Sequence, residues 1–233
     1  MINYKNGYKK GYKVDYLGWH FDNDKFKAFI KKIKPTESVI DIGCGHGYMT
    51  EIIPTENIKL FDIDDFRGVS KQYPFEKIDI SFDKLPLENE SQDYVFSISV
   101  LEHVENQFNL LREADRVLKP GGRLILLFPN GWNILSRFLF LYRCTFERWN
   151  RDRSNHITLL PRNVFWRLLE NYEKEEVIPS KKTNLFERLL YIFAPDVRGN
   201  PKIAWLTKIP IYVPSSEFWS MKICYILKKN IFK

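Results

Sequence analysis

The sequence predicts an α/β fold in which helices pack on both faces of a mostly parallel sheet, organised as a single domain over residues 1–233. Short apolar, β-branched runs alternate with segments whose apolar residues recur at helical spacing. The first run closes on Asp41 and a turn with three glycines, which is typical of a buried parallel strand that leads into a helix. A chain of this length can bury the core that such a fold needs.

Short apolar runs bounded by proline, glycine or acidic residues mark the expected strands. These runs are 38–42, 58–61, 77–80, 91–99, 123–128, 172–179 and 218–227. The segment Lys-Pro-Gly-Gly at 119–122 should end a helix and reverse the chain into the fifth strand.

Helices are expected where apolar residues recur every three or four positions. The first should begin after a cap at Asp22 or Asn23, and the one after the glycine turn must be short because Pro54 follows soon after. A third should start near Phe66, with Asp64 and Asp65 as caps. The remaining candidates are 107–118 with Phe108 facing inward, a segment around 134–139, 161–169 and 184–193.

Composition and charge indicate a protein of a reducing compartment, by default the cytoplasm. The N-terminal residues lack the apolar core of a signal peptide, and three widely spaced cysteines suggest no disulfide framework. Residues 1–116 hold 16 basic and 20 acidic side chains, whereas residues 117–233 hold 20 and 9. The basic half suits an anionic substrate or surface, although a lysine-rich composition alone would also explain it.

The glycine turn has the pattern D-x-G-x-G-x-G from Asp41 to Gly47. It differs from the dinucleotide fingerprint G-x-G-x-x-G, because Thr50 stands where that pattern requires a further glycine. Free N–H groups at the start of the following helix suit a carboxylate, and Asp41 suits an ammonium group. A ligand with an amino-acid end would satisfy both.

This turn resembles motif I of the class I S-adenosylmethionine-dependent methyltransferases, in their Rossmann-like small-molecule branch. Two further segments resemble the same family: Leu101-Glu102-His103 after the fourth strand, and Arg116 to Gly122 before the fifth. The resemblance implies a three-layer, doubly wound, seven-stranded sheet in the order 3-2-1-4-5-7-6 with the last strand antiparallel. It also implies S-adenosylmethionine as cofactor and S-adenosylhomocysteine as product.

The resemblance implies a set of cofactor-binding residues at the carboxyl edge of the sheet. Asp62 resembles the family's ribose-binding acid, and an adenine contact is expected at Asp79, Ile80 or Ser81. The full expected set is Asp41, Gly43, Cys44, Gly45, Gly47, Asp62, Ile63, Ile80 and Ser99.

His103 and His156 are the candidate general bases for a hydroxyl acceptor, because histidine titrates near neutral pH. Glu102 either orients His103 or acts as an alternative base, and each histidine has a structural alternative as a cap or core residue. No metal is expected, since no further group of acids and histidines has ligand spacing along the sequence.

Substrate-side elaborations are expected at 131–156 and 180–217, and an aromatic arm at 1–21. In the first of these, arginines alternate with aromatic residues, which suits phosphate, carboxylate or a stacked ring. The candidate substrate residues are Trp132, Arg137, Tyr142 and Arg143. An amphipathic helix there also suits peripheral contact with the inner membrane surface.

The sequence therefore predicts methyl transfer to a hydroxyl of a small molecule, a glycan or a lipid-linked acceptor that is anionic or partly apolar. An RNA methyltransferase that uses the basic half is a less favoured alternative. A non-catalytic module that keeps the fold and the cofactor is another. The oligomeric state stays open.

Overall fold

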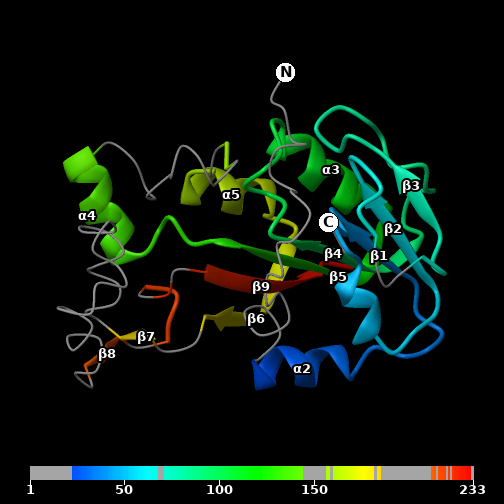
Figure 1. The fold of residues 1–233 in the computed structure, drawn as a ribbon, viewed down its shortest axis with the longest axis horizontal. Helices are drawn as coiled ribbons and strands as arrows, with labels where there is room; N and C mark the ends of the chain where they lie inside the picture. The colour runs from blue at the N-terminus through cyan, green and yellow to red at the C-terminus, as the bar shows by residue number, and fades with distance from the viewer. Residues whose placement is uncertain are drawn as a thin grey trace.

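The chain is represented by a computed structural model that describes residues 23–67, 71–143, 156–157, 160–180, 183–184, 211–213, 215–218, 220 and 222–231. The expected aromatic arm at 1–21 lies outside these residues, as does most of the expected elaboration at 180–217. Within them, helices flank a seven-stranded sheet on both faces (Figure 1).

The sheet confirms the predicted strand order and directions. Its order is β3-β2-β1-β4-β5-β9-β6, which corresponds to 3-2-1-4-5-7-6 because β9 is the seventh strand of the sheet along the chain. Neighbours from β3 to β5 are parallel, and β9 is antiparallel to both β5 and β6. The strands are β1 (Val39–Ile42), β2 (Ile58–Asp62), β3 (Phe75–Lys77), β4 (Gln92–Ile98), β5 (Leu118–Pro129), β6 (Tyr172–Pro179) and β9 (Lys222–Lys229).

Two strand positions were wrong. The third strand is β3 at Phe75–Lys77 rather than 77–80, because its partner β2 ends at Asp62, whose carbonyl accepts the N–H of Ile78 at 2.8 Å. The last strand begins at Lys222, four residues later than expected. The segment 119–122 already belongs to β5, and the pairing of β5 with β4 shifts register between Gln92 and Tyr94.

The described helices are α2 (Asp24–Ile30), the 3-10 turn η2 (Tyr48–Glu51), α3 (Gln107–Val117), α4 (Ile134–Arg143) and α5 (Arg162–Leu168). Asn23 caps α2, since its side chain accepts the N–H groups of Lys25 and Phe26 at 3.0 and 3.4 Å. The short η2 confirms that Pro54 leaves no room for a full helix after the glycine turn.

Three helix expectations differ from the structure. No helix begins at Phe66 within the described residues 64–67, and Asp65 instead pairs with Arg67 at 2.9 Å. Of the expected helix at 184–193 only Asn184 lies within the described residues, and it belongs to strand β7 (Thr183–Asn184), which pairs with β8 (Tyr212–Val213). Phe108 is exposed, because Leu110 and Leu111 occupy the inward face of α3.

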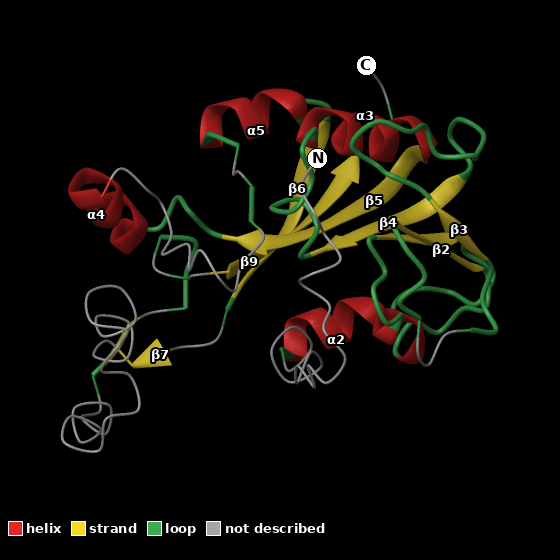
Figure 2. Cartoon of the chain, turned by 45° about the horizontal axis from the view of Figure 1, so that its top comes forward, coloured by secondary structure: helices red, strands yellow, loops and turns green. Residues whose placement is uncertain are grey.

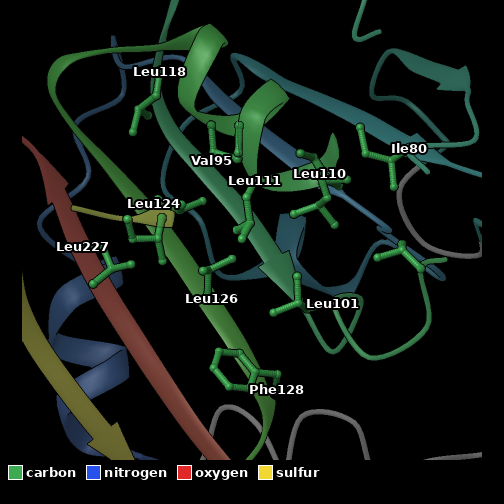
Figure 3. Packing of buried hydrophobic residues seen from close by; sticks show 14 of the residues in the cluster. Ile80, Val95, Leu101, Leu110, Leu111, Leu118, Leu124, Leu126, Phe128 and Leu227 are labelled. Atoms are coloured by element: carbon green, nitrogen blue, oxygen red, sulfur yellow. The ribbon is translucent and has the colours of Figure 1, made fainter. Parts of the chain in front are cut away.

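Side chains of alternate residues in the central strands belong to two apolar cores on opposite faces of the sheet. The helices α3 and α5 cover one face and α2 covers the other (Figure 2). Figure 3 shows Leu111 of α3 pointing towards Leu126 of β5 and Leu101, and all three side chains are buried. These cores hold β1, β2 and β4 rigidly, so the loops at their carboxyl ends are fixed relative to one another.

The helix α4 lies beyond the end of the sheet, apart from α2, α3 and α5 (Figures 1 and 2). Phe138 and Leu141 on this helix are exposed. Among the described residues, no helix is both long and apolar enough to cross a bilayer.

Candidate active site

The turn after β1 is built from three glycines with left-handed backbone. Gly43, Gly45 and Gly47 have φ angles of 73°, 51° and 78°. The N–H groups of Gly43 and Cys44 both donate to the carbonyl of Phe61 in β2, at 2.8 and 3.1 Å. Glycine is required here because other residues adopt this conformation only at a cost.

Two of these glycines face different surroundings. A Cβ added at Gly43 would lie 2.3 Å from the side chain of Val100, so this glycine lets the turn pack against the loop after β4. A Cβ at Gly45 would meet no atom within 4 Å, so this glycine borders open space. The turn therefore packs on the protein at Gly43 and leaves room for a ligand at Gly45.

Asp62, the last residue of β2, faces the glycine turn. Its Oδ2 accepts the N–H of Gly45 at 2.8 Å, and its Oδ1 accepts the N–H of Ile63 at 2.7 Å. Burial raises the pKa of Asp62, and the hydrogen bonds from the backbone partly oppose this rise. Each carboxylate oxygen keeps acceptor capacity, so the group suits a pair of neighbouring hydroxyls such as those of a ribose.

Asp41 lies in β1, directly beneath the turn, and is 2% exposed. Burial, with a smaller contribution from the charge of Asp62, raises the pKa of Asp41 to about 8. Two buried carboxyls thus line one pocket, and a cationic ligand would favour their ionised forms.

The loop after β4, which packs against the glycine turn at Gly43, forms another wall of the pocket. Ser99 has a φ of 56°, and its N–H bonds to the carbonyl of Leu127 at 2.7 Å, which holds this strained residue in place. Beyond it, Glu102 is buried, and the side chain of His103 is 27% exposed. The rings of His103 and His156 have centroids 4.8 Å apart, and the N–H of Ile157 donates to the carbonyl of Glu102 at 2.8 Å.

A pocket joins these walls at the carboxyl ends of β1, β2 and β4, where ligands bind in sheets of this kind. It brings together Asp41, Gly43, Cys44, Gly45, Asp62, Ile63, Ile80, Ser99 and His103 from the expected residues. Gly47 is not part of the lining; its N–H closes the turn onto the carbonyl of Cys44 at 2.8 Å. Glu102 and His156 are not part of the lining, but their side chains lie next to that of His103.

The expected substrate residues do not line this pocket. The ring of Trp132 packs edge-on against that of Phe128, with the ring centroids 5.6 Å apart, and its indole N–H donates to the carbonyl of Leu160. Arg137 is exposed and donates to the carbonyl of Trp132 at 3.1 Å. Tyr142 and Arg143 end α4, and their side chains lie outside the described residues. A role for these four residues stays a prediction.

Several lining residues were not in the expected set. Val100 follows the strained Ser99, and Met49 follows the glycine turn, so both are positioned by backbone geometry that has no sequence signature. Asp79 and Ser81, two of the three candidates for the adenine contact, also line the pocket. The Asp79 side chain accepts the N–H of Ser81 at 3.0 Å, which orders this wall.

The comparisons with known proteins agree with this geometry. Residues 40–126 match a family model described as a methyltransferase domain. A Mycolicibacterium smegmatis protein, named as a probable S-adenosylmethionine-dependent methyltransferase, is 32% identical over 99 residues. A malonyl-[acyl-carrier protein] O-methyltransferase from Hahella chejuensis is 32% identical over 101 residues. The matches cover 40% and 38% of this chain but only 38% and 35% of those proteins.

Solved structures share the whole fold. A S-adenosylmethionine-dependent methyltransferase from Archaeoglobus fulgidus superposes with a TM-score of 0.56 at 18% identity, covering 92% of this chain and 97% of that one. A second, from Mesorhizobium loti, has a TM-score of 0.52 at 13% identity, and the match covers 89% of this chain and 99% of that one. The pocket also fits the cofactor, because buried carboxylates and an open glycine turn meet there. Residues 40–126 are therefore similar to a methyltransferase domain, and the chain shares the fold of these solved structures.

Proposed function

We propose that this protein methylates a hydroxyl group on a small molecule, a sugar or a lipid-linked acceptor. The observation that carries this proposal is the group formed by Glu102, His103 and His156, of which His103 lines the pocket. Such a group can receive the proton that a hydroxyl loses on methylation. An amine acceptor that enters as the free base does not need a general base in the same way.

Bound S-adenosylmethionine would supply a methyl group that its sulfonium already activates. The acceptor oxygen would bond to the methyl carbon as the carbon–sulfur bond breaks with its electron pair left on sulfur, and the hydroxyl proton would pass to a base. The protein's work is then mainly positioning. Asp62 would hold the ribose hydroxyls of S-adenosylmethionine, and Asp41 would balance its positive charge. Asp79, Ile80 and Ser81 form the adenine wall. His103 accepts the hydroxyl proton, with His156 and Glu102 orienting it.

The acceptor is expected to be anionic or partly apolar. The helix α4 carries exposed Phe138 and Leu141 beside the cationic Arg137, and the second half of the chain is strongly basic. This combination supports an acceptor with a phosphate or carboxylate and an apolar part, and it supports peripheral contact with a membrane surface.

A labelled-methyl assay tests the acceptor class. The protein is incubated with methyl-labelled S-adenosylmethionine and, separately, with water-soluble metabolites, a lipid extract and total RNA. We expect label in the metabolite or lipid fraction, held as an ether that resists mild alkali. Label released by alkali would indicate a carboxylate acceptor and contradict the proposal. Label in RNA would favour the RNA methyltransferase, and binding of S-adenosylhomocysteine without any transfer would favour a non-catalytic module.

Matched variants link any transfer to the site. Asp62→Asn should abolish transfer at low cofactor concentration, whereas Glu51→Gln, an exposed acid on η2 outside the pocket lining, should leave it unchanged. His103→Gln should lower kcat while the affinity for S-adenosylhomocysteine stays within about twofold, because the base acts on the acceptor. Equal loss of affinity and kcat would indicate that His103 only supports the pocket.

A further inference from the structure

The fold brings together three metal-ligand side chains that are separated along the chain. Glu102 and His103 follow β4, and His156 comes 53 residues after His103. One ligand atom from each side chain lies within 4.8 Å of the other two. The hydrogen bond from the N–H of Ile157 to the carbonyl of Glu102, at 2.8 Å, fixes the two segments against each other.

We propose that Glu102, His103 and His156 bind a divalent transition-metal ion at the acceptor side of the pocket. Two imidazoles and one carboxylate form a donor set that suits zinc, manganese, iron or cobalt and leaves coordination positions open. This site was not expected from the sequence, because His156 is remote from the Glu-His pair until the chain folds.

The distances allow an ion to be held with small movements. Nε2 of His103 and Oε1 of Glu102 are 4.0 Å apart, so they would have to move slightly closer to bind one tetrahedral ion. Ligand atoms of a tetrahedral site lie roughly 3.4 Å apart, as follows from bonds of about 2.1 Å. The ligand nitrogen of His156 lies within 4.8 Å of the other two ligand atoms, so it would also have to move closer to reach the same ion.

Burial also favours a cation here. Glu102 is 1% exposed, so a divalent ion bound by its carboxylate would interact with it in a medium of low dielectric, where attraction between opposite charges is strong. His103 lines the pocket, so the open coordination positions would face the space where an acceptor enters.

The role of the ion rests on the proposed hydroxyl acceptor. In the metal-bound protein the ion would replace His103 as the group that promotes proton loss: an acceptor oxygen bound to the ion would have a lowered pKa and would lose its proton to solvent. The ion would also favour acceptors with a second oxygen next to the methylated hydroxyl, such as vicinal diols, catechols or α-hydroxy acids, because two oxygens can chelate it. Metal binding itself does not depend on the nature of the acceptor.

Metal titration tests the site directly. The full-length protein, stripped with a chelator, is titrated with Co²⁺ while its visible absorption is recorded, and Zn²⁺ is then added as competitor. We expect one Co²⁺ per chain, displaced by Zn²⁺. Glu102→Gln and His156→Asn should each weaken binding by at least about tenfold. His46→Asn removes an exposed histidine outside the cluster and should bind Co²⁺ as the wild type does.

The outcomes separate the metal site from the proposed function. No Co²⁺ signal, or equal loss in His46→Asn, would overturn the site, with an unchanged circular dichroism spectrum and denaturation midpoint showing that each variant is folded. If the stripped protein methylates a hydroxyl acceptor at the full rate, the ion's role is wrong but the hydroxyl acceptor stands. If the protein binds Co²⁺ through the cluster and methylates only amines, the site stands and the hydroxyl acceptor is wrong.

Discussion

The backbone N–H of Gly45 donates a 2.8 Å hydrogen bond to Oδ2 of Asp62, which joins the turn after β1 to the end of β2. The two segments of the cofactor pocket therefore hold each other in place. A change to either residue should alter the ligand contact and the shape of the turn together, which makes this pair the most direct test of the site.

Asp62→Asn should weaken the binding of S-adenosylhomocysteine by about 10- to 150-fold, the range expected for the loss of a hydrogen bond to a charged group. The amide has one acceptor oxygen and cannot receive both backbone N–H groups and the ribose hydroxyls. Isothermal titration gives the affinity. Glu51→Gln, the same chemical change at an exposed acid, should bind like the wild type; a weaker Glu51→Gln would show that net charge alone matters.

Gly43→Ala and Gly45→Ala should have different effects. At Gly43 the left-handed backbone and the clash with Val100 should lower the free energy of unfolding by about 2–5 kcal/mol. At Gly45 only the backbone strain applies, about 1–2 kcal/mol, but the methyl group would fill the open space and block the cofactor.

Urea denaturation and ligand titration separate the two cases. The double variant Gly43→Ala/Val100→Ala should recover part of the stability, because the two closest contacts are to the Cγ atoms of Val100. Stability equal to that of Gly43→Ala alone would show that strain, and not the clash, dominates.

Asp41 should make the ligand-free protein less stable as the pH rises. Its pKa is raised from 3.8 to about 8 in the folded protein, so the folded state binds a proton that the unfolded state has already lost. The resulting stabilisation is complete below about pH 4 and is lost as the pH rises through about 8. Denaturation midpoints measured between pH 5 and pH 9 should show this slope in the wild type and a smaller one in Asp41→Asn. Equal slopes in the wild type and in Asp41→Asn would show that a group other than Asp41 binds this proton.

Cofactor binding should release close to one proton per chain at pH 7. Asp41 is largely protonated in the free protein at that pH, and the net positive charge of S-adenosylmethionine should lower the pKa of this buried carboxyl. Titration calorimetry in buffers of different ionisation enthalpy gives the number of protons. Asp41→Asn should release few or none, and uptake of a proton by the wild type would contradict this account.

The central architecture could be predicted because its signals are local. The run Val39–Ile42 is followed by a glycine-rich segment that is compatible with few structures other than a tight turn. Asp62 ends a second apolar run at the same edge of the sheet. Strand order followed from resemblance to a family with these motifs. β6 at Tyr172–Pro179 and α3 were placed to within a residue, since their apolar patterns are clear.

The remaining features depend on contacts between distant segments. β3 is three residues long and pairs only with β2 among the described strands, so no local pattern marks its ends. The proximity of His156 to His103 comes from the backbone hydrogen bond between Ile157 and Glu102. Phe108 was misplaced because a helical spacing of apolar residues fits more than one face of α3.

The position of β9 between β5 and β6 has a consequence for synthesis on the ribosome. Strands β1 to β5 can pair as they emerge, but β6 pairs only with β9 among the described strands and must wait until residues 222–229 have been translated. Until then the apolar strand β5 has no partner along the edge that β9 occupies in the complete fold. A polypeptide interrupted before residue 222 would expose two unpaired strand edges and should aggregate, even though every segment of the cofactor pocket had already been made.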